Sequence, residues 1–426
     1  MNLWQTNYFT RGFWGDEAWT VLISRLSLGE ILKITGQDFH PPAYYFLVHW
    51  WGNTWGWSEV AVRSLSLFFF LLTLILVYFF AQKLKFAKLP SILASFLILL
   101  SPILFTYAFE ARSYALLTFL SVLVSFIFWL SLAQKSKVWK LAYFLVGALG
   151  IYSHYYFWFV LFSHGIYVLL FERKKLLSVL APAIGIALAQ LPWLPVFLSQ
   201  INSVSNSYWI APINARTHYE FFLRVAGGDH VTIWQKPASL LIFGVIIYGL
   251  ITKFAGKKIK QNTLFLLTWL IVPTLIPSLI SLKTPIFFYR YLIFSSVPLL
   301  LLFVSSFKNK KTLLVFSGAL LFMYGLVSYS KFTRSPFSMR EKQKELVTQG
   351  KITNPSYTVL PKFAEVYYYL GDEVRVSVIP EGLVQFSGLS LLKAYQEKGL
   401  VEIKEPTEKN YLLIKDGLEI EYVHQN

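Results

Sequence analysis

The chain has 426 residues, of which 55% are hydrophobic, 18% aromatic and 14% charged, with a mean hydropathy of +0.52. Soluble domains carry about 25% charged residues, so this composition excludes a soluble protein and indicates an integral membrane protein. The absence of cysteine excludes disulfides, thiol nucleophiles and cysteine-bound zinc. The net charge of +17 does not indicate a nucleic-acid binder, because the excess Lys and Arg lie in short gaps between apolar runs.

The N-terminal forty residues differ from the apolar runs that follow them. Residues 1–10 have no apolar run long enough for a signal peptide or a spanning helix. Between residues 18 and 33, apolar side chains recur near helical spacing, which predicts one short helix in the membrane interface. The prolines at 41 and 42 then predict an extended turn, since each restricts itself and the residue before it.

A spanning helix needs about 20 apolar residues, and ten stretches meet or approach that length. They are residues 60–82, 89–108, 114–133, 138–152, 155–171, 176–198, 238–254, 263–282, 291–307 and 312–330. The sequence therefore predicts an all-α polytopic membrane bundle of about ten transmembrane helices, over residues 1–330.

Basic residues lie in alternate connections between these stretches, near residues 83–88, 135–140, 173–175, 253–260 and 308–311. The positive-inside rule places those connections in the cytoplasm, so the other connections and the C-terminus face outward across the plasma membrane. Residue 1 would then also lie outside. Polytopic chains commonly begin inside, so we expect a first helix upstream of Met1.

From residue 331 the composition becomes that of a soluble domain, with balanced charge. Periodicity predicts strands at 357–360, 374–379, 400–404, 411–415 and 418–423, and helices at 362–370 and 389–398. This order predicts a small extracytoplasmic α/β domain over residues 331–426.

Asp16 and Glu17 precede the predicted interface helix, and two interpretations are open. Asp16 is either an N-cap with Glu17 favourable to the helix dipole, or a general base that takes a proton from a hydroxyl group.

Further ionisable residues lie at the outward ends of apolar stretches. Glu110 is either a local ion-pair partner of Arg112 or a functional carboxylate, because ionisable residues near the membrane are often functional. Arg112 offers a planar donor set for a phosphate. Arg290 is either an interfacial residue beside the aromatic-belt residue Tyr291 or an anion ligand, and Arg63 is a weaker candidate of the same kind.

Asp38 and His40 form a possible metal pair, although two ligands do not make a metal site. His154 lies at an outward turn among tyrosines, either as an interfacial residue or as a ligand. The histidines at 49 and 164 lie within apolar stretches and are interpreted as packing residues.

Together these segments resemble the membrane glycosyltransferases of the C superfamily (GT-C), which include the protein O-mannosyltransferase and aminoarabinose transferase families. The resemblance covers most of residues 11–330 and depends on the order and spacing of five fragments. They are Gly15-Asp16-Glu17, Asp38-Phe39-His40-Pro41-Pro42-Ala43-Tyr44-Tyr45, Glu59-Val60-Ala61-Val62-Arg63, Tyr107-Ala108-Phe109-Glu110-Ala111-Arg112-Ser113-Tyr114 and Tyr152-Ser153-His154-Tyr155-Tyr156.

The resemblance implies an enzyme that moves a sugar from a polyprenyl-phosphate carrier to an acceptor hydroxyl of a glycan, lipid or protein, with inversion, at the outer face. It implies catalytic roles for Asp16 as the base, for Glu17 and for Glu110. We expect the donor phosphate to bind Arg112, Arg290 and Arg63. Candidate substrate contacts are Asp38, His40, Tyr44, Tyr114, His154 and Tyr291. No cofactor is assigned, and a divalent metal is left open.

Two other classes of function compete with this one. A transporter or flippase of lipid-linked sugars would place ionisable residues at mid-membrane and show inverted repeats. The ionisable residues instead gather at one face, and no repeat is visible. An anchoring protein with an extracellular module would not need the acidic and basic groups described above.

Overall fold

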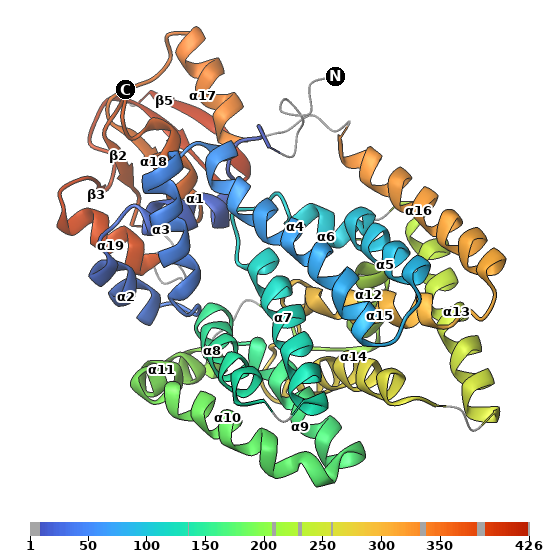
Figure 1. Ribbon diagram of the computed structural model, residues 1–426. Coiled ribbons are helices and arrows are strands. Elements are labelled where there is room, and N and C mark those ends of the chain that lie inside the picture. Colours follow the sequence, from blue (N-terminus) through green and yellow to red (C-terminus); the bar gives the residue numbers. More distant parts are fainter. Residues whose placement is uncertain are drawn as a thin grey trace. The chain divides into compact units, whose positions relative to one another are not determined.

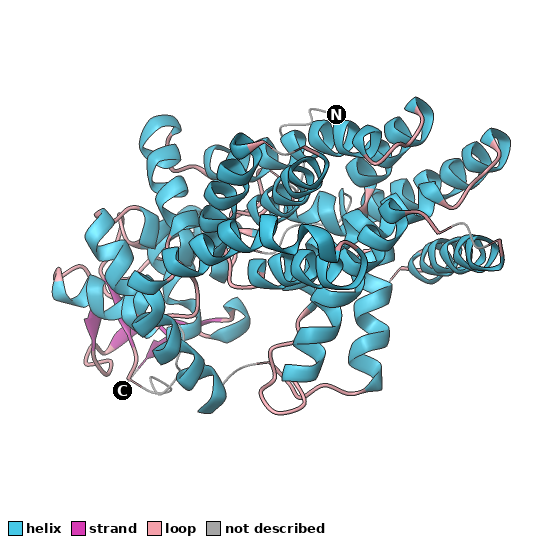
Figure 2. Ribbon diagram, turned by 60° about the horizontal axis from the view of Figure 1, so that its bottom comes forward, coloured by secondary structure: helices cyan, strands magenta, loops and turns pink. Residues whose placement is uncertain are grey.

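The computed structural model describes residues 9–134, 136–206, 210–228, 232–256, 259–332, 338–380 and 388–424. The described residues are mostly helical, and their strands all belong to the C-terminal region (Figures 1 and 2). The architecture is therefore the predicted one, a helical membrane protein with a small C-terminal sheet.

The chain packs into two compact units. The first unit comprises Met1–Leu65, Glu110–Arg112 and Phe332–Asn426, and the second comprises Ser66–Phe109 and Ser113–Lys331. A three-residue segment between two apolar helices thus packs with both ends of the chain. The division into two domains at residue 330, which was drawn from composition, stays a prediction.

The second unit consists of helices and short 3-10 turns. They are α5 (Lys88–Leu100), α6 (Pro102–Tyr107), α7 (Tyr114–Ala133), α8 (Lys137–Ser153), α9 (Phe157–Phe171), η2 (Arg173–Lys175), α10 (Leu176–Ala189), η3 (Leu191–Trp193), α11 (Leu194–Asn206), α12 (Ala215–Gly227), α13 (Gln235–Ala255), α14 (Gln261–Ile280), η4 (Tyr289–Ser295), α15 (Ser296–Ser305) and α16 (Lys310–Phe332). Helix α4 (Glu59–Lys83) begins in the first unit and continues into the second.

Six helical segments among the described residues are long and apolar enough to cross a membrane, which makes this a multi-pass membrane protein. They are Glu59–Lys83, Tyr114–Ala133, Arg173–Val204, Gln235–Ala255, Gln261–Ile280 and Lys310–Tyr329, and shorter apolar helices cover Lys88–Leu100, Phe157–Phe171 and Tyr289–Ser305. All ten predicted stretches are largely helical, but the number that cross the membrane stays a prediction.

Two of the predicted stretches are interrupted at prolines. The stretch 89–108 divides into α5 and α6 at Ser101, which has a non-helical ψ of 116°. The residue before a proline is driven out of the helical region, and Pro102 then begins α6. The stretch 176–198 divides similarly at the 3-10 turn η3 (Leu191–Trp193), which contains a proline. The connection between the predicted stretches 176–198 and 238–254 contains the helix α12.

The core of the second unit is aromatic. The ring of His164 on α9 stacks on Phe128 of α7 with centroids 4.3 Å apart, and its nitrogens lie within hydrogen-bond distance of Ser125 and Tyr143. His164 is fully buried. Its partners are those of a packing residue, as the sequence indicated.

The first unit begins with α1 (Gly15–Ser24), α2 (Leu28–Gly36) and α3 (Ala43–Trp55). The single helix predicted over residues 18–33 is wrong, because α1 and α2 are separate. A capping box divides them: the Ser27 hydroxyl accepts the backbone N–H of Glu30, and the Glu30 carboxylate accepts the backbone N–H of Ser27 at 3.0 Å. Helix α3, which was not predicted, begins directly after the two prolines.

The C-terminal region of the first unit is the predicted α/β module, with each predicted strand and helix present. It comprises α17 (Met339–Thr348), β1 (Ser356–Thr358), η5 (Leu360–Lys362), α18 (Phe363–Leu370), β2 (Val376–Val378), α19 (Leu389–Glu397), β3 (Glu402–Ile403), β4 (Asn410–Ile414), η6 (Asp416–Leu418) and β5 (Ile420–His424). Helix α17 was not predicted, because it buries only Met339 and Leu346 and has little apolar pattern.

The sheet has the strand order β3-β2-β1-β4-β5. Strand β1 pairs in parallel with β2 and with β4, and only β5 is antiparallel to its neighbour. All three residues of β1 and of β2 are buried, as expected for parallel strands covered on both faces.

The packing of α8 on α9 gives a stability prediction. A Cβ added at Gly150 would lie 2.2 Å from the ring of Phe157, which is fully buried, whereas a Cβ at Gly165 meets nothing within 4 Å. Gly150→Ala should therefore destabilise the protein by roughly 1–3 kcal/mol through overpacking. Gly165→Ala should be neutral or slightly stabilising. Thermal unfolding in detergent measures both, and equal midpoints for the two variants would contradict the described packing.

Candidate active site

A fully buried ion pair connects α1 and α4 in the first unit. Glu17 lies in the first turn of α1, and Arg63 lies one turn into α4. The guanidinium donates to the carboxylate through Nε at 2.9 Å and through Nη2 at 2.6 Å. Both side chains are fully buried, so the pair is shielded from water and from salt.

The remaining donors of Arg63 bind the chain that precedes α1. Its Nη1 donates to the carbonyls of Phe9 at 2.9 Å and Arg11 at 2.6 Å, and its Nη2 also donates to the carbonyl of Gly12 at 3.2 Å. A guanidinium has five N–H groups, and these contacts together with those to Glu17 engage all five. Arg63 has no donor left for a phosphate while this arrangement persists.

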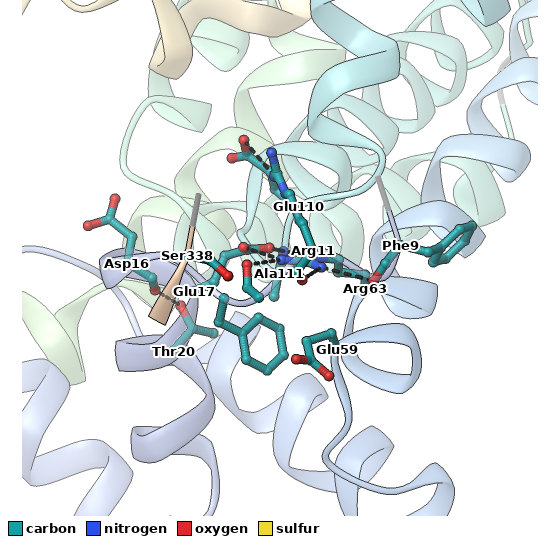
Figure 3. A network of polar contacts seen from close by, with 12 residues as sticks. Phe9, Arg11, Asp16, Glu17, Thr20, Glu59, Arg63, Glu110, Ala111 and Ser338 are labelled. Carbon is teal, nitrogen blue, oxygen red and sulfur yellow. Dashed lines mark hydrogen bonds and ion pairs between the residues drawn. The ribbon is translucent and has the colours of Figure 1, made fainter. Parts of the chain in front are cut away.

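Glu17 also fixes the segment that contains Glu110. Its Oε1 accepts the backbone N–H of Ala111 at 2.8 Å. Figure 3 shows the carboxylate between Arg63 and this N–H group. One carboxylate thus connects α1, α4 and the 110–112 segment, which are far apart in the sequence.

The ion pair changes how stability depends on pH. Burial alone raises the pKa of a carboxyl group, but Arg63, together with Arg11 and the N–H of Ala111, outweighs burial and holds the pKa of Glu17 below its usual value of 4.5. The folded-state pKa is therefore below the unfolded one. The resulting stability is present above about pH 4.5 and is lost as the pH falls through the folded-state pKa.

Asp16 has a different environment from its neighbour. Its side chain is 44% exposed, and its carboxylate lies 3.5 Å from Nη2 of Arg112. Figure 3 shows it pointing away from the Glu17–Arg63 pair. The N-cap of α1 is Trp14, without a side-chain cap, so the interpretation of Asp16 as the N-cap is wrong. The structure instead presents an accessible carboxylate beside a guanidinium.

Arg112 is held against the first turn of α1 by further contacts. Its Nη1 lies 3.4 Å from the backbone carbonyl of Asp16 and 3.5 Å from the hydroxyl of Thr20. Thr20 in turn donates to the same carbonyl at 2.8 Å. The Arg112 side chain is 7% exposed, and these contacts hold its guanidinium next to the first turn of α1.

The other candidate residues of the first unit form separate contacts. Glu110 pairs with Arg11 at 3.4 Å. Asp38, which is buried, lies 3.2 Å from Nδ1 of His40. Tyr44 is buried at the start of α3. Within the described part of the chain, no group of three or more His, Asp or Glu side chains is arranged to hold a metal ion.

The second unit brings together three of the predicted substrate contacts. Tyr291 lies 5.3 Å from His154 and 6.3 Å from Tyr114, measured between ring centroids, and Tyr156 joins them at 5.0 Å from Tyr291. Next to Tyr291 in the chain, Arg290 lies over the ring of Phe288 at 5.1 Å. This unit therefore contains an aromatic group with an adjacent cation.

Some contacting residues were missed by sequence reasoning. Arg11, which pairs with Glu110, lies five residues before Asp16 and outside the five fragments that carry the family resemblance. Arg224 on α12 lies over the ring of Tyr289 at 4.4 Å, and α12 is in a connection for which the sequence predicted no spanning helix. A helical apolar pattern at Phe221 and Val225, both buried, was the signal that could have placed α12.

The chain has the fold of the GT-C membrane glycosyltransferases. The aminoarabinose transferase ArnT from Cupriavidus metallidurans, in the apo state, superposes with a TM-score of 0.62 at 12% identity, over 96% of this chain and 90% of that chain. The same enzyme bound to undecaprenyl phosphate gives a TM-score of 0.61 at 13% identity, with the same coverage.

A second kind of enzyme shares the fold less completely. The Archaeoglobus fulgidus oligosaccharyltransferase, in a complex with zinc and sulfate, gives a TM-score of 0.51 at 13% identity, covering 84% of this chain and 58% of that chain. No family model matches the chain, and no curated protein matches it. The structural likeness therefore establishes the fold.

Removing the cation of the buried Glu17–Arg63 pair tests how much the pair contributes to the stability of the fold. Arg63→Met leaves the Glu17 carboxylate buried without its counter-charge, so we expect a destabilisation of roughly 3–5 kcal/mol. The control is Lys33→Met, because Lys33 pairs with Glu397 at 3.7 Å where both side chains are more than 60% exposed. That variant should change stability by less than about 1 kcal/mol. Similar unfolding midpoints for the two variants in detergent would contradict this interpretation.

Proposed function

We propose that the protein is a membrane glycosyltransferase that transfers a sugar from a polyprenyl-phosphate carrier to an acceptor hydroxyl. The observation that carries the proposal is the accessible Asp16 carboxylate, held beside Arg112 at the start of α1 in a chain with the GT-C fold. The ArnT structure bound to undecaprenyl phosphate supports a polyprenyl-phosphate donor. The sugar is a hexose or pentose, and the acceptor is a glycan, lipid or protein.

The proposed reaction is a direct displacement. Asp16 takes the proton of the acceptor hydroxyl, and the acceptor oxygen attacks the anomeric carbon of the sugar. The bond from that carbon to the phosphate oxygen breaks, and the phosphate departs with the electron pair, so the anomeric configuration inverts. A lipid phosphate is a fair leaving group, and the base and the cations supply proton removal and charge stabilisation.

The three acidic candidates take different roles in this proposal. Asp16 is the base because it is accessible. Glu17 is a positioning residue, because both its oxygens already accept from Arg63 and one also accepts from Ala111. Glu110, paired with Arg11, stays a candidate for contact with the acceptor or the donor head group.

The basic candidates divide in the same way. We assign Arg63 to holding Glu17 and residues 9–12, since its five donors are engaged by the Glu17 carboxylate and by carbonyls of that segment. Arg112 in the first unit or Arg290 in the second is the proposed cation for the departing phosphate. Asp38, His40 and Tyr44 in the first unit, and Tyr114, His154 and Tyr291 in the second, are the proposed substrate contacts.

The proposed location is the plasma membrane, with the reaction at the outer face. The alternation of Lys-rich and Lys-poor connections supports this orientation. The C-terminal module lies on the outer side in the same scheme, because it packs with α1 in the first unit.

Asp16→Asn tests the base directly. The amide cannot take a proton, so transfer should fall by roughly 100-fold or more, while binding of undecaprenyl phosphate stays within twofold. The assay uses purified protein, a polyprenyl-phosphate sugar and mass analysis of the product. Glu397→Gln, at an exposed carboxylate of α19, is the control and should retain parental activity. Transfer at the parental rate by the Asn variant would remove Asp16 from the mechanism.

Arg290→Ala tests the phosphate contact in the second unit. Loss of a charge-assisted hydrogen bond should raise the dissociation constant for undecaprenyl phosphate about tenfold. Arg216→Ala removes an exposed guanidinium of α12 and should leave the constant unchanged. Titration calorimetry in detergent measures both. An unchanged affinity for the Arg290 variant would exclude its proposed role.

A further inference from the structure

We propose that the C-terminal α/β module is part of the catalytic machinery as a positioning element, in which Glu365 and Tyr369 of α18 hold the start of α1. This inference rests on the proposed function for the role of Asp16. It assigns a task to a module that carries no catalytic motif in its sequence.

Glu365 lies at the start of α1, where the N-cap residue Trp14 makes no side-chain cap. The backbone N–H of Gly15 favours the charged form of the Glu365 carboxyl group and so acts to lower its pKa, against the larger effect of burial. A Cβ added at Gly15 would lie 3.3 Å from Oε1 of Glu365. Glu365 is itself buried and paired with Lys362 at 3.1 Å. A carboxylate at a helix N-terminus satisfies a free N–H group and favours the helix dipole.

Tyr369 holds the residues just before α1. Its hydroxyl accepts the backbone N–H of Phe13 at 2.7 Å and donates to Oε1 of Glu59 at 2.8 Å. Glu59 is the first residue of α4, the helix that carries Arg63. Burial raises the pKa of Tyr369, and the neighbouring Glu59 raises it further, so the hydroxyl stays protonated and keeps donating.

The segment before Asp16 is therefore held from two directions. Arg63 binds its carbonyl groups at Phe9, Arg11 and Gly12, and on α18 Tyr369 binds the N–H of Phe13 while Glu365 lies beside Gly15. A Cβ at Gly12 would lie 2.4 Å from the Ser338 hydroxyl, so glycine is needed for this approach. At the other end of α1, the Tyr395 hydroxyl donates to the carbonyl of Leu22 at 3.1 Å.

This arrangement matters because residues 12–14 have no regular secondary structure. A general base must be held in a narrow range of positions, and a misplacement of about 1 Å can cost on the order of 100-fold in rate. Asp16 is nearly half exposed, so its position depends on the backbone of the first turn. The contacts from α18 act on that backbone.

The test combines hydrogen exchange with kinetics on Tyr369→Phe in the full-length protein. Losing this hydroxyl should speed amide exchange in peptides covering residues 9–19 by roughly three- to tenfold, while exchange in α7 and α14 is unchanged. The kcat for transfer should fall about tenfold or more, with an unchanged KM for the lipid-linked donor.

The matched control is Tyr422→Phe. Tyr422 lies on β5 of the same module and donates its hydroxyl to the carbonyl of Lys351 at 2.7 Å, away from α1. Like Tyr369→Phe, this variant loses a hydrogen bond between a tyrosine hydroxyl and the backbone. Exchange in residues 9–19 and kcat should both equal those of the parent protein.

Glu365 provides a second, graded pair of variants. Glu365→Gln keeps an acceptor for the Gly15 N–H, and Glu365→Ala removes it. We expect Ala to speed exchange and lower kcat more than Gln does, with thermal unfolding showing that each variant remains folded. Recovery of kcat by Gln relative to Ala is the result that general destabilisation of the module would not produce.

The outcomes distinguish the positioning role of α18 from the proposed glycosyltransferase function. Unchanged exchange in residues 9–19 for both Tyr369→Phe and Glu365→Ala would overturn the positioning role. So would accelerated exchange with parental kcat. Absence of sugar transfer by the parent protein with polyprenyl-phosphate donors would instead overturn the proposed function, while the exchange measurements would still decide whether α18 holds the start of α1.

Discussion

The Glu17–Arg63 ion pair is the constraint on which the organisation of the first unit depends. A buried ion pair repays the free-energy cost of desolvation only if its remaining donors and acceptors form hydrogen bonds. Here carbonyls of residues 9–12 and the N–H of Ala111 supply those hydrogen bonds. That requirement brings three distant stretches of the chain together, around residues 9–17, Arg63 and Ala111. Asp16, one residue away, is then left beside Arg112 with an exposed carboxylate.

Local structure was predictable where periodicity and composition decide it. Helix α7 has the predicted limits, and the strands of the C-terminal module follow their apolar pattern. The break between α1 and α2 was readable from Ser27 and Glu30, a capping-box spacing that was overlooked. The hydrogen-bond partners of Arg63 could not be predicted. The sequence indicated Arg63 as an anion ligand, but the structure shows that backbone carbonyls accept from it. Every residue has a backbone carbonyl, so the sequence does not reveal which carbonyls a side chain will contact.

The adjacent acids Asp16 and Glu17 differ in burial, and this difference determines what each carboxylate can do. Glu17 is enclosed, and its pKa is held low by Arg63 against the opposing effect of burial, so it behaves as a fixed counter-charge. The Asp16 side chain is 44% exposed, so its carboxylate remains in contact with solvent. Helical geometry separates neighbouring side chains by about 100° around the axis, which is enough to place one in the core and the other at the surface.

The first unit is assembled from both ends of the chain, with the apolar helices of the second unit between them in sequence. During translation the ribosome produces α1 early but α18 only after residue 363. The membrane helices can therefore insert while the N-terminal segment still lacks its partners. Such long-range contacts form late because loop closure is costly, so a ribosome that stalls before the codon for Phe363 would leave an inserted protein without α18.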